Sequence, residues 1–293
     1  AAPFVRTGPT QSGNYVRWAA SCVYVLYHQA GTAHLAGDLE FEIMDAALAT
    51  WVAESQPEAY LDLVADERSD HEVGRDGVNF VIFREDRWCR PAVDDMAEVC
   101  HNASAAGITL VTFVDDESSD RDGEIVDADI ELNGVNFAVS NQGVTLGAAP
   151  CMADLGNTFT HEMGHLMGLD HTCRLADEPA EIDHLGNPVP LCSATTDTAI
   201  VEATMYPSQT CGETKKISQA PDDVLAIRTI YPVADDPGEC FHPSLTNPGC
   251  CSAGGVGRPW LTLALATGVL LGLRRRRRSR GGRYAPSHRS RWS

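Results

Sequence analysis

Three histidines within one short segment constrain what this chain can fold into more than any other feature of the sequence. His161 and His165 are four residues apart, and His171 follows six residues later. Side chains four residues apart on a helix project from the same face about one turn apart, so both histidines can bind one metal ion. Gly168 can adopt the left-handed conformation that ends a helix. The chain can therefore bend there and bring His171 round as a third ligand.

The residues around the first two histidines predict an amphipathic helix over residues 154–168. Asp154 is a plausible N-cap, because a carboxylate at this position can accept a hydrogen bond from a free N–H group of the first turn. The buried side of the helix is predicted to consist of four apolar residues: Leu155, Phe159, Met163 and Leu166.

The donor set is typical of catalytic rather than structural zinc. Three imidazoles leave the fourth tetrahedral position to water. Zinc lowers the pKa of its bound water to about 7 and polarises a carbonyl group. Glu162 directly follows the first histidine, so its carboxylate can lie over the open position. There it could take the proton of the water and pass it to a leaving amine, which predicts hydrolysis of peptide bonds.

A second signal lies about thirty residues downstream, in the segment 203–207 (ATMYP). A turn at Met205 can form a floor beneath the three imidazoles. Taken alone, a bare His-Glu-x-x-His pattern is often a coincidence, and Met205 would be interpreted as core filler. The extra glycine and third histidine at set offsets, combined with Met205, favour the metal site over both of these interpretations.

With these motifs, the chain resembles the metzincin clan of zinc peptidases and, within it, the matrixins including their bacterial members. The segment His161–His171 matches the clan's His-Glu-x-x-His-x-x-Gly-x-x-His signature, and Met205 matches its Met-turn. Residues 222–231 are similar to the family's C-terminal helix, and residues 122–130 to the strand before the active-site helix of bacterial relatives. The likeness extends from about residue 15 to 232.

The resemblance implies an α+β fold, with a twisted, mostly parallel sheet over two helices and a cleft above a smaller C-terminal subdomain. It assigns metal-ligand roles to His161, His165 and His171, the general-base role to Glu162 and the structural turn to Met205. A catalytic Zn²⁺ would lie at the cleft floor, and a peptide would bind extended along the sheet edge. The implied function is an exported zinc-dependent endopeptidase. An inactive metzincin-fold surface binding module is the alternative, against which the retained glutamate argues.

The other apolar patterns also indicate an α+β domain, with strands first and helices later. A helix capped by Asp38 is predicted from apolar residues at helical spacing: Met44, Leu48, Trp51 and Val52. Strands are predicted over 22–27, 60–64, 78–83, 108–114 and 125–132, and a final helix over 221–231.

Ten cysteines favour an oxidising compartment. Eight of them lie before residue 241, and eight cysteines allow on the order of a hundred pairings. The pairs Cys89–Cys100 and Cys173–Cys192 are predicted because each would close a short loop; buried free thiols are the alternative. The chain begins with Ala-Ala-Pro, and small residues flank signal-peptide cleavage sites. We therefore expect a processed, exported protein.

The C-terminal region has the features of an export signal. The apolar run Trp260–Leu273 is followed at once by five arginines, Arg274–Arg278. This run is shorter than the roughly 20 residues of a usual bilayer span, and a buried core helix is the alternative. Together with Cys250, Cys251 and a Gly-rich stretch, the tail resembles the C-terminal sorting tail of exported myxobacterial proteins. That resemblance implies transient membrane association, cleavage near the two cysteines, and a domain on the cell surface or outside the cell.

Charge and composition divide the chain further. Ten of the 22 basic residues follow Cys251, which leaves 12 basic against 41 acidic residues before it. Nucleic acid is a polyanion and would be repelled by so acidic a domain, so it is excluded as a partner. We also expect the protein to be a monomer. Four segments are predicted: an irregular N-terminus (1–14), a metzincin-like catalytic domain (15–240), a Cys/Gly/Pro linker (241–259), and an apolar helix with an Arg-rich sorting tail (260–293).

The acid-rich segment 118–129 partly resembles an EF-hand calcium loop. Ser118 stands at the first position, Asp129 replaces the final glutamate, and a strand rather than a helix is expected to follow. A solvated loop is the favoured interpretation, and a structural Ca²⁺ ion is the alternative.

Overall fold

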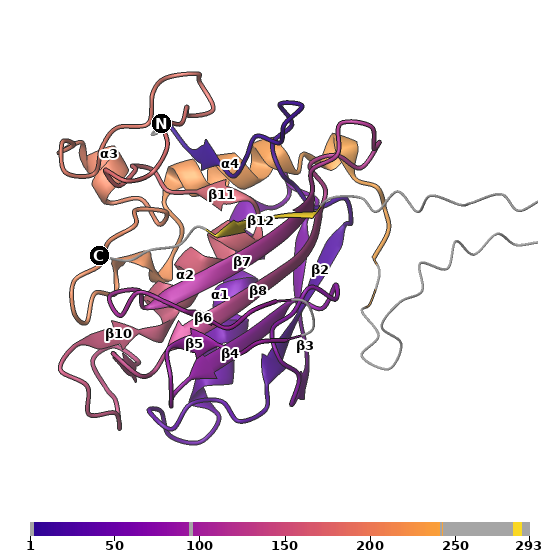
Figure 1. Ribbon diagram of the computed structural model, residues 1–293. Coiled ribbons are helices and arrows are strands. Elements are labelled where there is room, and N and C mark those ends of the chain that lie inside the picture. Colours follow the sequence, from indigo (N-terminus) through magenta and orange to yellow (C-terminus); the bar gives the residue numbers. More distant parts are fainter. Residues whose placement is uncertain (1–2, 94–95, 241, 243–283, 289–293) are drawn as a thin grey trace, which may run out of the picture.

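A six-stranded sheet organises the chain (Figure 1). The computed structural model describes residues 3–93, 96–240 and 242, and the backbone of 284–288. β3, β2, β4 and β8 run parallel, whereas β7 is antiparallel to β8 and β12 to β7. The sheet is thus mixed and mostly parallel, as predicted. The strands, in spatial order, are β12 Tyr284–His288, β7 Gly107–Val114, β8 Ile125–Asn133, β4 Phe80–Arg84, β2 Cys22–His28 and β3 Asp62–Ser69.

Two long helices pack against one face of this sheet, α1 (Leu39–Ser55) and α2 (Leu155–Leu166). Figure 1 shows both of them behind the strands. The indole of Trp51 in α1 donates a hydrogen bond to the carbonyl of Thr160 in α2 (3.1 Å), which links the two helices. A third helix, α4 (Pro221–Ile230), packs against α1. The α+β architecture with two helices beneath the sheet confirms the predicted fold class.

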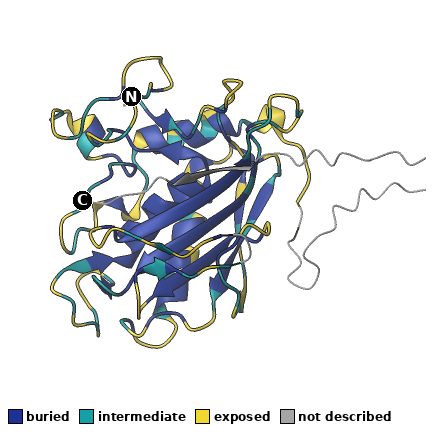
Figure 2. Cartoon of the chain, viewed as in Figure 1, coloured by how far each residue is buried: buried dark blue, intermediate teal, exposed yellow. Residues whose placement is uncertain are grey.

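Both faces of the sheet are covered. On the helix side, Val81 and Phe83 of β4 belong to the main hydrophobic core together with Phe159 of α2. On the other face, Phe80 and Ile82 of the same strand belong to a second cluster. Successive side chains of a strand point to opposite faces, so burial on both faces explains why residues 80–83 of β4 are a continuous apolar run. Figure 2 shows the strands largely buried and the exposed residues concentrated in loops.

The expected helix after Asp38 forms, but not through the expected cap. Asp38 occupies the N-cap position of α1, yet its side chain makes no capping hydrogen bond. Its carboxylate instead forms an ion pair with Arg68 of β3 (3.0 Å). The capping prediction was therefore wrong, because a tertiary partner competes for the carboxylate. β3 itself extends beyond the predicted end at residue 64 to Ser69, and its polar second half pairs with β2 through the backbone.

Four disulfides join the eight cysteines of the described domain. The two predicted pairs, Cys89–Cys100 and Cys173–Cys192, are confirmed. Two further disulfides connect residues that are far apart in the sequence, Cys151 with Cys211 and Cys22 with Cys240.

The remaining elements are short. The segment 1–14, predicted to be irregular, contributes β1, which pairs with β11 just before the third histidine of the motif. The two-stranded sheets are β1 Val5–Arg6 with β11 Leu169–Asp170, β5 Cys89–Arg90 with β6 Val99–Cys100, and β9 Ala138–Ser140 with β10 Met152–Asp154. The short helices are α3 Thr198–Val201 and the 3-10 turns η1 Lys215–Ile217 and η2 Val233–Asp235.

Most of the predicted linker and tail lies outside the described residues, including the apolar run Trp260–Leu273. The strand β12 belongs to the segment predicted as tail, and its backbone pairs with residues 110–114 of β7. Within the part of the chain that the structure describes, no helix has the length and apolar character needed to cross a bilayer.

Candidate metal centre

The helix α2 carries the first two histidines and is held as the sequence predicts. The Asp154 carboxylate accepts a hydrogen bond from the N–H of Asn157 (3.0 Å), so this residue caps the helix. Every residue of α2 is buried. The four residues of its predicted apolar side are each at most 1% exposed: Leu155, Phe159, Met163 and Leu166.

The chain turns after α2 at Gly168, whose φ is 88°. The left-handed backbone disfavours a side chain there. A Cβ atom would also be crowded, because it would lie 3.0 Å from the carbonyl oxygen of Val16. After this turn β11 runs back, and His171 follows it directly. The predicted bend at Gly168 is therefore present.

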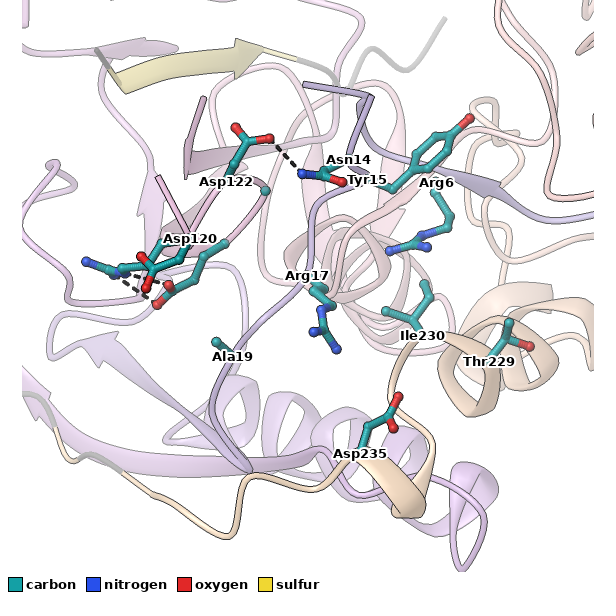
Figure 3. A pocket seen from close by; sticks show the side chains of 13 residues that line it. Arg6, Asn14, Tyr15, Arg17, Ala19, Asp120, Asp122, Thr229, Ile230 and Asp235 are labelled. Carbon is teal, nitrogen blue, oxygen red and sulfur yellow. Dashed lines mark hydrogen bonds and ion pairs between the residues drawn. The ribbon is translucent and has the colours of Figure 1, made fainter. Parts of the chain in front are cut away.

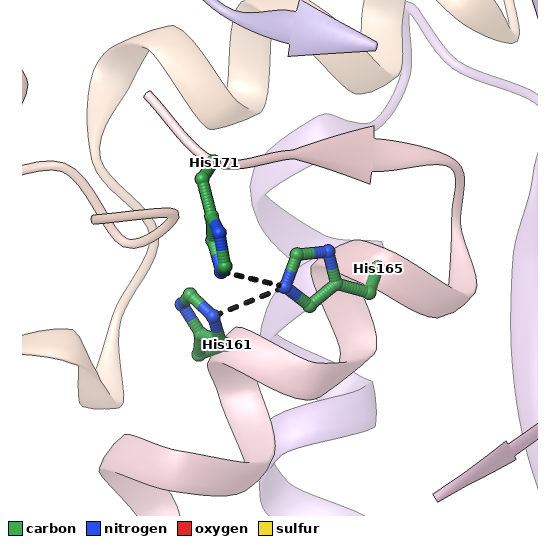
Figure 4. A group of neighbouring side chains, drawn as sticks. All are labelled: His161, His165 and His171. Atoms are coloured by element: carbon green, nitrogen blue, oxygen red, sulfur yellow. Dashed lines mark hydrogen bonds between the residues drawn. The ribbon is translucent and has the colours of Figure 1, made fainter. Parts of the chain in front are cut away.

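The three histidines point toward one another (Figure 4). The Nε2 atom of His165 lies 3.2 Å from Nε2 of His161 and 3.2 Å from Nε2 of His171. A tetrahedral zinc ion with Zn–N bonds of 2.0–2.1 Å requires nitrogen atoms about 3.3 Å apart. The observed separations fit that requirement, so the three side chains could hold one metal ion.

Hydrogen bonds fix which nitrogen of two of these rings faces the centre. Nδ1 of His161 donates to the carbonyl of Thr204 (2.7 Å), and Nδ1 of His165 donates to the carbonyl of Leu169 (2.9 Å). In the neutral rings the two Nε2 atoms are therefore lone-pair acceptors that face each other without a proton to share. A cation between the two Nε2 atoms would remove the repulsion between their lone pairs. Two such lone pairs are also the ligands that a metal ion needs.

Burial favours the neutral, metal-binding form of the same rings. It is the largest cause that lowers the pKa of His161 well below its ordinary value, with further lowering from His165, Lys216 and His171. The pKa of His165 is also lowered, again mainly by burial, although Glu162 opposes the shift. Both imidazoles are thus neutral at neutral pH, as metal ligation demands.

Glu162, the predicted general base, is completely buried at the interface between α2 and β7. Its Oε2 atom accepts a hydrogen bond from the hydroxyl of Thr109 in β7 (2.6 Å). The sequence motif places this glutamate beside the histidines but gives no sign of Thr109, which lies 53 residues earlier.

Met205 lies next to α2, where the sequence predicts a turn beneath the imidazoles. It is 1% exposed, and its sulfur occupies the space that a side chain at Gly164 would need. The neighbouring residue Thr204 supplies the carbonyl that binds His161. The backbone carbonyl of Met205 accepts a hydrogen bond from Thr172, directly after the third histidine (3.1 Å). The turn therefore contacts both halves of the histidine motif.

Two residues that sequence reasoning missed hold this turn. The Asp223 carboxylate, in the first turn of α4, accepts a hydrogen bond from the N–H of Thr204 (3.1 Å). The Lys216 amine is fully buried and donates to the carbonyls of Tyr206 (2.5 Å) and Ser208 (3.0 Å). Burial lowers the pKa of Lys216 to about 7. Lys216 belongs to no short motif. Asp223 lies in the segment likened to the family's C-terminal helix, but only the fold shows its contact with the turn.

The acidic segment considered for calcium is organised by hydrogen bonds. Asp122 accepts from Thr10 and from Asn14, both at 2.8 Å. The Asp129 carboxylate accepts hydrogen bonds from the backbone N–H groups of Gly74 (2.9 Å) and Phe80 (3.0 Å). Among the described residues, the three histidines are the one group of three or more His, Cys, Asp or Glu side chains arranged to hold a metal. A calcium site in this segment is not shown.

A cavity of about 480 Å³ lies elsewhere, at the N-terminal loop, the β7–β8 loop and the end of α4 (Figure 3). Arg6, Arg17 and Asp235 are among the residues that line it, and Asn14 donates a hydrogen bond to Asp122, which also lines it. None of the residues predicted for the metal centre lines this cavity. We therefore assign it no part in the chemistry of the histidines.

Residues 78–172, about a third of the chain, match the model of a family described as Metallo-peptidase family M12B, Reprolysin-like. The matched segment runs from just before β4 through all three histidines and Glu162. The match supports a metzincin-type zinc peptidase, whose cofactor is zinc and whose substrates are proteins or peptides. No curated protein matches the chain significantly. The matrixin-like subtype and the sorting tail stay predictions.

Proposed function

We propose that this chain is an exported, matrixin-like zinc endopeptidase. The observation that carries the proposal is the convergence of His161, His165 and His171, with Nε2 separations that fit one tetrahedral ion, next to buried Glu162. The Met-Tyr-Pro sequence at Met205 supports the matrixin-like subtype. Four disulfides are consistent with an extracellular location.

Metal binding and proton transfer would fall to different residues of the centre. The three histidines would hold the zinc ion through Nε2, with the Thr204 and Leu169 carbonyls orienting two of the rings. A bound zinc ion supplies Lewis acidity for the activation of water and of a carbonyl group. The carboxylate of Glu162 would accept a proton from the attacking water and deliver it to the leaving amine.

The substrate would bind as an extended peptide along the edge of β7. An edge strand offers unpaired N–H and C=O groups to which another extended segment can add. The antiparallel pairing of β12 with residues 110–114 supports this, because it is an example of an extended segment on that edge. The register of β12 ends at Leu110, next to the part of β7 that contacts Glu162.

The first test is the replacement of Glu162. We expect Glu162→Ala to fold and to bind one zinc ion per chain, because the three histidines are unchanged. Peptide hydrolysis should fall by about 10²- to 10⁴-fold, the usual contribution of a general acid–base group. The measurement is cleavage of a diverse peptide library followed by mass spectrometry, with zinc content determined on the same samples.

Chelation provides the matched control for this variant. Activity of the parent protein should disappear on treatment with a chelator and return when zinc is added. Undiminished turnover by Glu162→Ala would exclude the proposed mechanism. A parent protein that binds zinc but cleaves nothing in the library would fit the inactive binding module instead.

A further inference from the structure

The carboxylate of Glu162 lies against two residues of β7, Gly107 and Thr109, that the histidine motif does not include. The hydroxyl of Thr109 lies 2.6 Å from Oε2 of Glu162 and 3.1 Å from the backbone carbonyl of the same residue. A hydroxyl has one proton to donate. Bonds from a hydroxyl to an ionised carboxylate measure about 2.5–2.7 Å. The shorter contact therefore identifies the carboxylate as the acceptor.

Gly107 provides the space for the other carboxylate oxygen. It lies two residues before Thr109, on the same face of the strand. A Cβ atom at this position would be 2.7 Å from Oε1 and 2.9 Å from Cγ of Glu162. Real Cβ atoms do not approach other atoms so closely, so any side chain here would displace the glutamate.

Both sides of this contact belong to rigid elements. Gly107 and Thr109 pair with Leu132 and Ile130 of the neighbouring strand β8. Thr109 is 1% exposed, and its branched side chain has few accessible rotamers. A glutamate anchored on such a surface keeps one side-chain conformation, whereas a free glutamate would sample several.

We propose that Thr109 is a positioning residue for Glu162, and that Gly107 leaves the room the positioned carboxylate requires. The inference rests on the proposed peptidase function, for which Glu162 is the general base. The hydroxyl holds Oε2, which fixes the direction of the whole carboxylate before a substrate arrives. This assigns Thr109 a task distinct from filling the core.

The test compares Thr109→Val with Thr109→Ser in the zinc-loaded protein. Valine has nearly the same shape but no hydroxyl, whereas serine keeps the hydroxyl. We expect Thr109→Val to lower kcat about 10- to 100-fold with little change in KM, the size of effect usual for groups that orient a site from outside it. Thr109→Ser should recover most of the lost kcat. Zinc content should stay at one ion per chain in both variants.

A crystal structure of each variant supplies a readout that does not depend on turnover. In Thr109→Val the Glu162 carboxylate should leave the position beside Gly107, and in Thr109→Ser it should stay there. Gly107→Ala should displace it as well. Thr112→Val controls for the loss of a buried hydroxyl from β7, because the Thr112 hydroxyl has no hydrogen-bond partner among the described residues. The melting temperature of this control should match that of the parent.

The outcomes separate this inference from the function on which it rests. Parent-like kcat in Thr109→Val, or equal losses in the valine and serine variants, would overturn the positioning role while leaving the peptidase function intact. A parent protein without any hydrolysis would overturn the peptidase function. In that case the crystal structures still decide: an unmoved carboxylate in Thr109→Val would show that the hydroxyl does not hold it.

Discussion

Two backbone carbonyls decide which nitrogen each of two histidines presents to a metal ion. The carbonyl of Thr204 binds Nδ1 of His161 across 43 residues of sequence, and the N–H of Thr204 is held in turn by the Asp223 carboxylate. The orientation of His161 therefore depends on a turn and on a second helix, not on α2 alone. The loss of such an outer contact typically lowers metal affinity or activity about 10- to 100-fold.

Gly164 offers a direct test of the contact between α2 and the turn. A Cβ atom at this position would overlap the sulfur of buried Met205. We expect Gly164→Ala to lower the free energy of unfolding by about 1–3 kcal/mol, the usual cost of overpacking a core. Gly156→Ala in the same helix is the control, since a Cβ atom there would lie 3.3 Å from its nearest neighbour, Cγ1 of Ile217. Denaturant titration that finds both variants equally stable would contradict this.

Lys216 should make stability depend on pH in the alkaline range. Its folded pKa is about 7, whereas an unfolded lysine titrates near 10.4. Between about pH 7 and 10 the unfolded chain thus holds a proton that the folded chain has released, so the contribution of Lys216 to stability rises with pH. The free energy of unfolding of the parent, minus that of Lys216→Met, should increase by up to about 1.4 kcal/mol per pH unit. A flat difference would mean that the lysine stays charged when folded.

The residues that sequence reasoning placed correctly are those with fixed spacing. His161, Glu162 and His165 share one helix, so their arrangement follows from helical geometry. Thr109, Lys216 and Asp223 reach the same region from three other elements. Asp223 lies in the segment likened to the family's C-terminal helix, but the local sequence of none of the three indicates its contact at the site. Such contacts form only when the fold brings distant segments together, so they could not be predicted.

At the scale of elements, the two aspartates at helix starts should behave differently. Asp154 is buried and accepts hydrogen bonds from the N–H groups of Asn157 (3.0 Å) and Gln142 (2.6 Å). Asp38 only pairs with Arg68 at the surface. We expect Asp154→Ala to cost about 1–3 kcal/mol of stability and Asp38→Ala less than about 1 kcal/mol. Equal costs in denaturant titrations would imply that Asp38 caps α1 after all.

Elements with strong apolar patterns were predictable, and those held by pairing alone were not. β4 and β7 are apolar runs, and their predicted bounds lie within two residues of the observed ones. The second half of β3 is polar and forms because β2 offers it backbone partners. Disulfides follow the same logic: Cys89–Cys100 spans 11 residues and was predictable, whereas Cys22–Cys240 spans 218 and depends on the whole fold.

At the scale of the whole molecule, β12 places the backbone of residues 284–288 at the edge of the sheet. The residues before Cys251 hold all 41 acidic residues, while ten of the 22 basic residues follow it. Opposite charges favour an encounter between the two parts. The structure pairs the backbone of β12 with residues 110–114 of β7, the edge along which we propose that substrates bind. A substrate and this segment would then compete for the same backbone groups.

Shortening the chain should reveal that competition. A chain that ends at Arg283 lacks β12, and one that ends at His288 keeps it, while both retain the same arginines of the tail. We expect the shorter chain to have a lower KM for peptide substrates and an unchanged kcat, because the edge of β7 is freed and the residues around Glu162 stay as they are. Steady-state kinetics on one peptide measure both constants. Equal KM values would show that β12 does not obstruct the edge, and a change confined to kcat would place its influence at the metal centre instead.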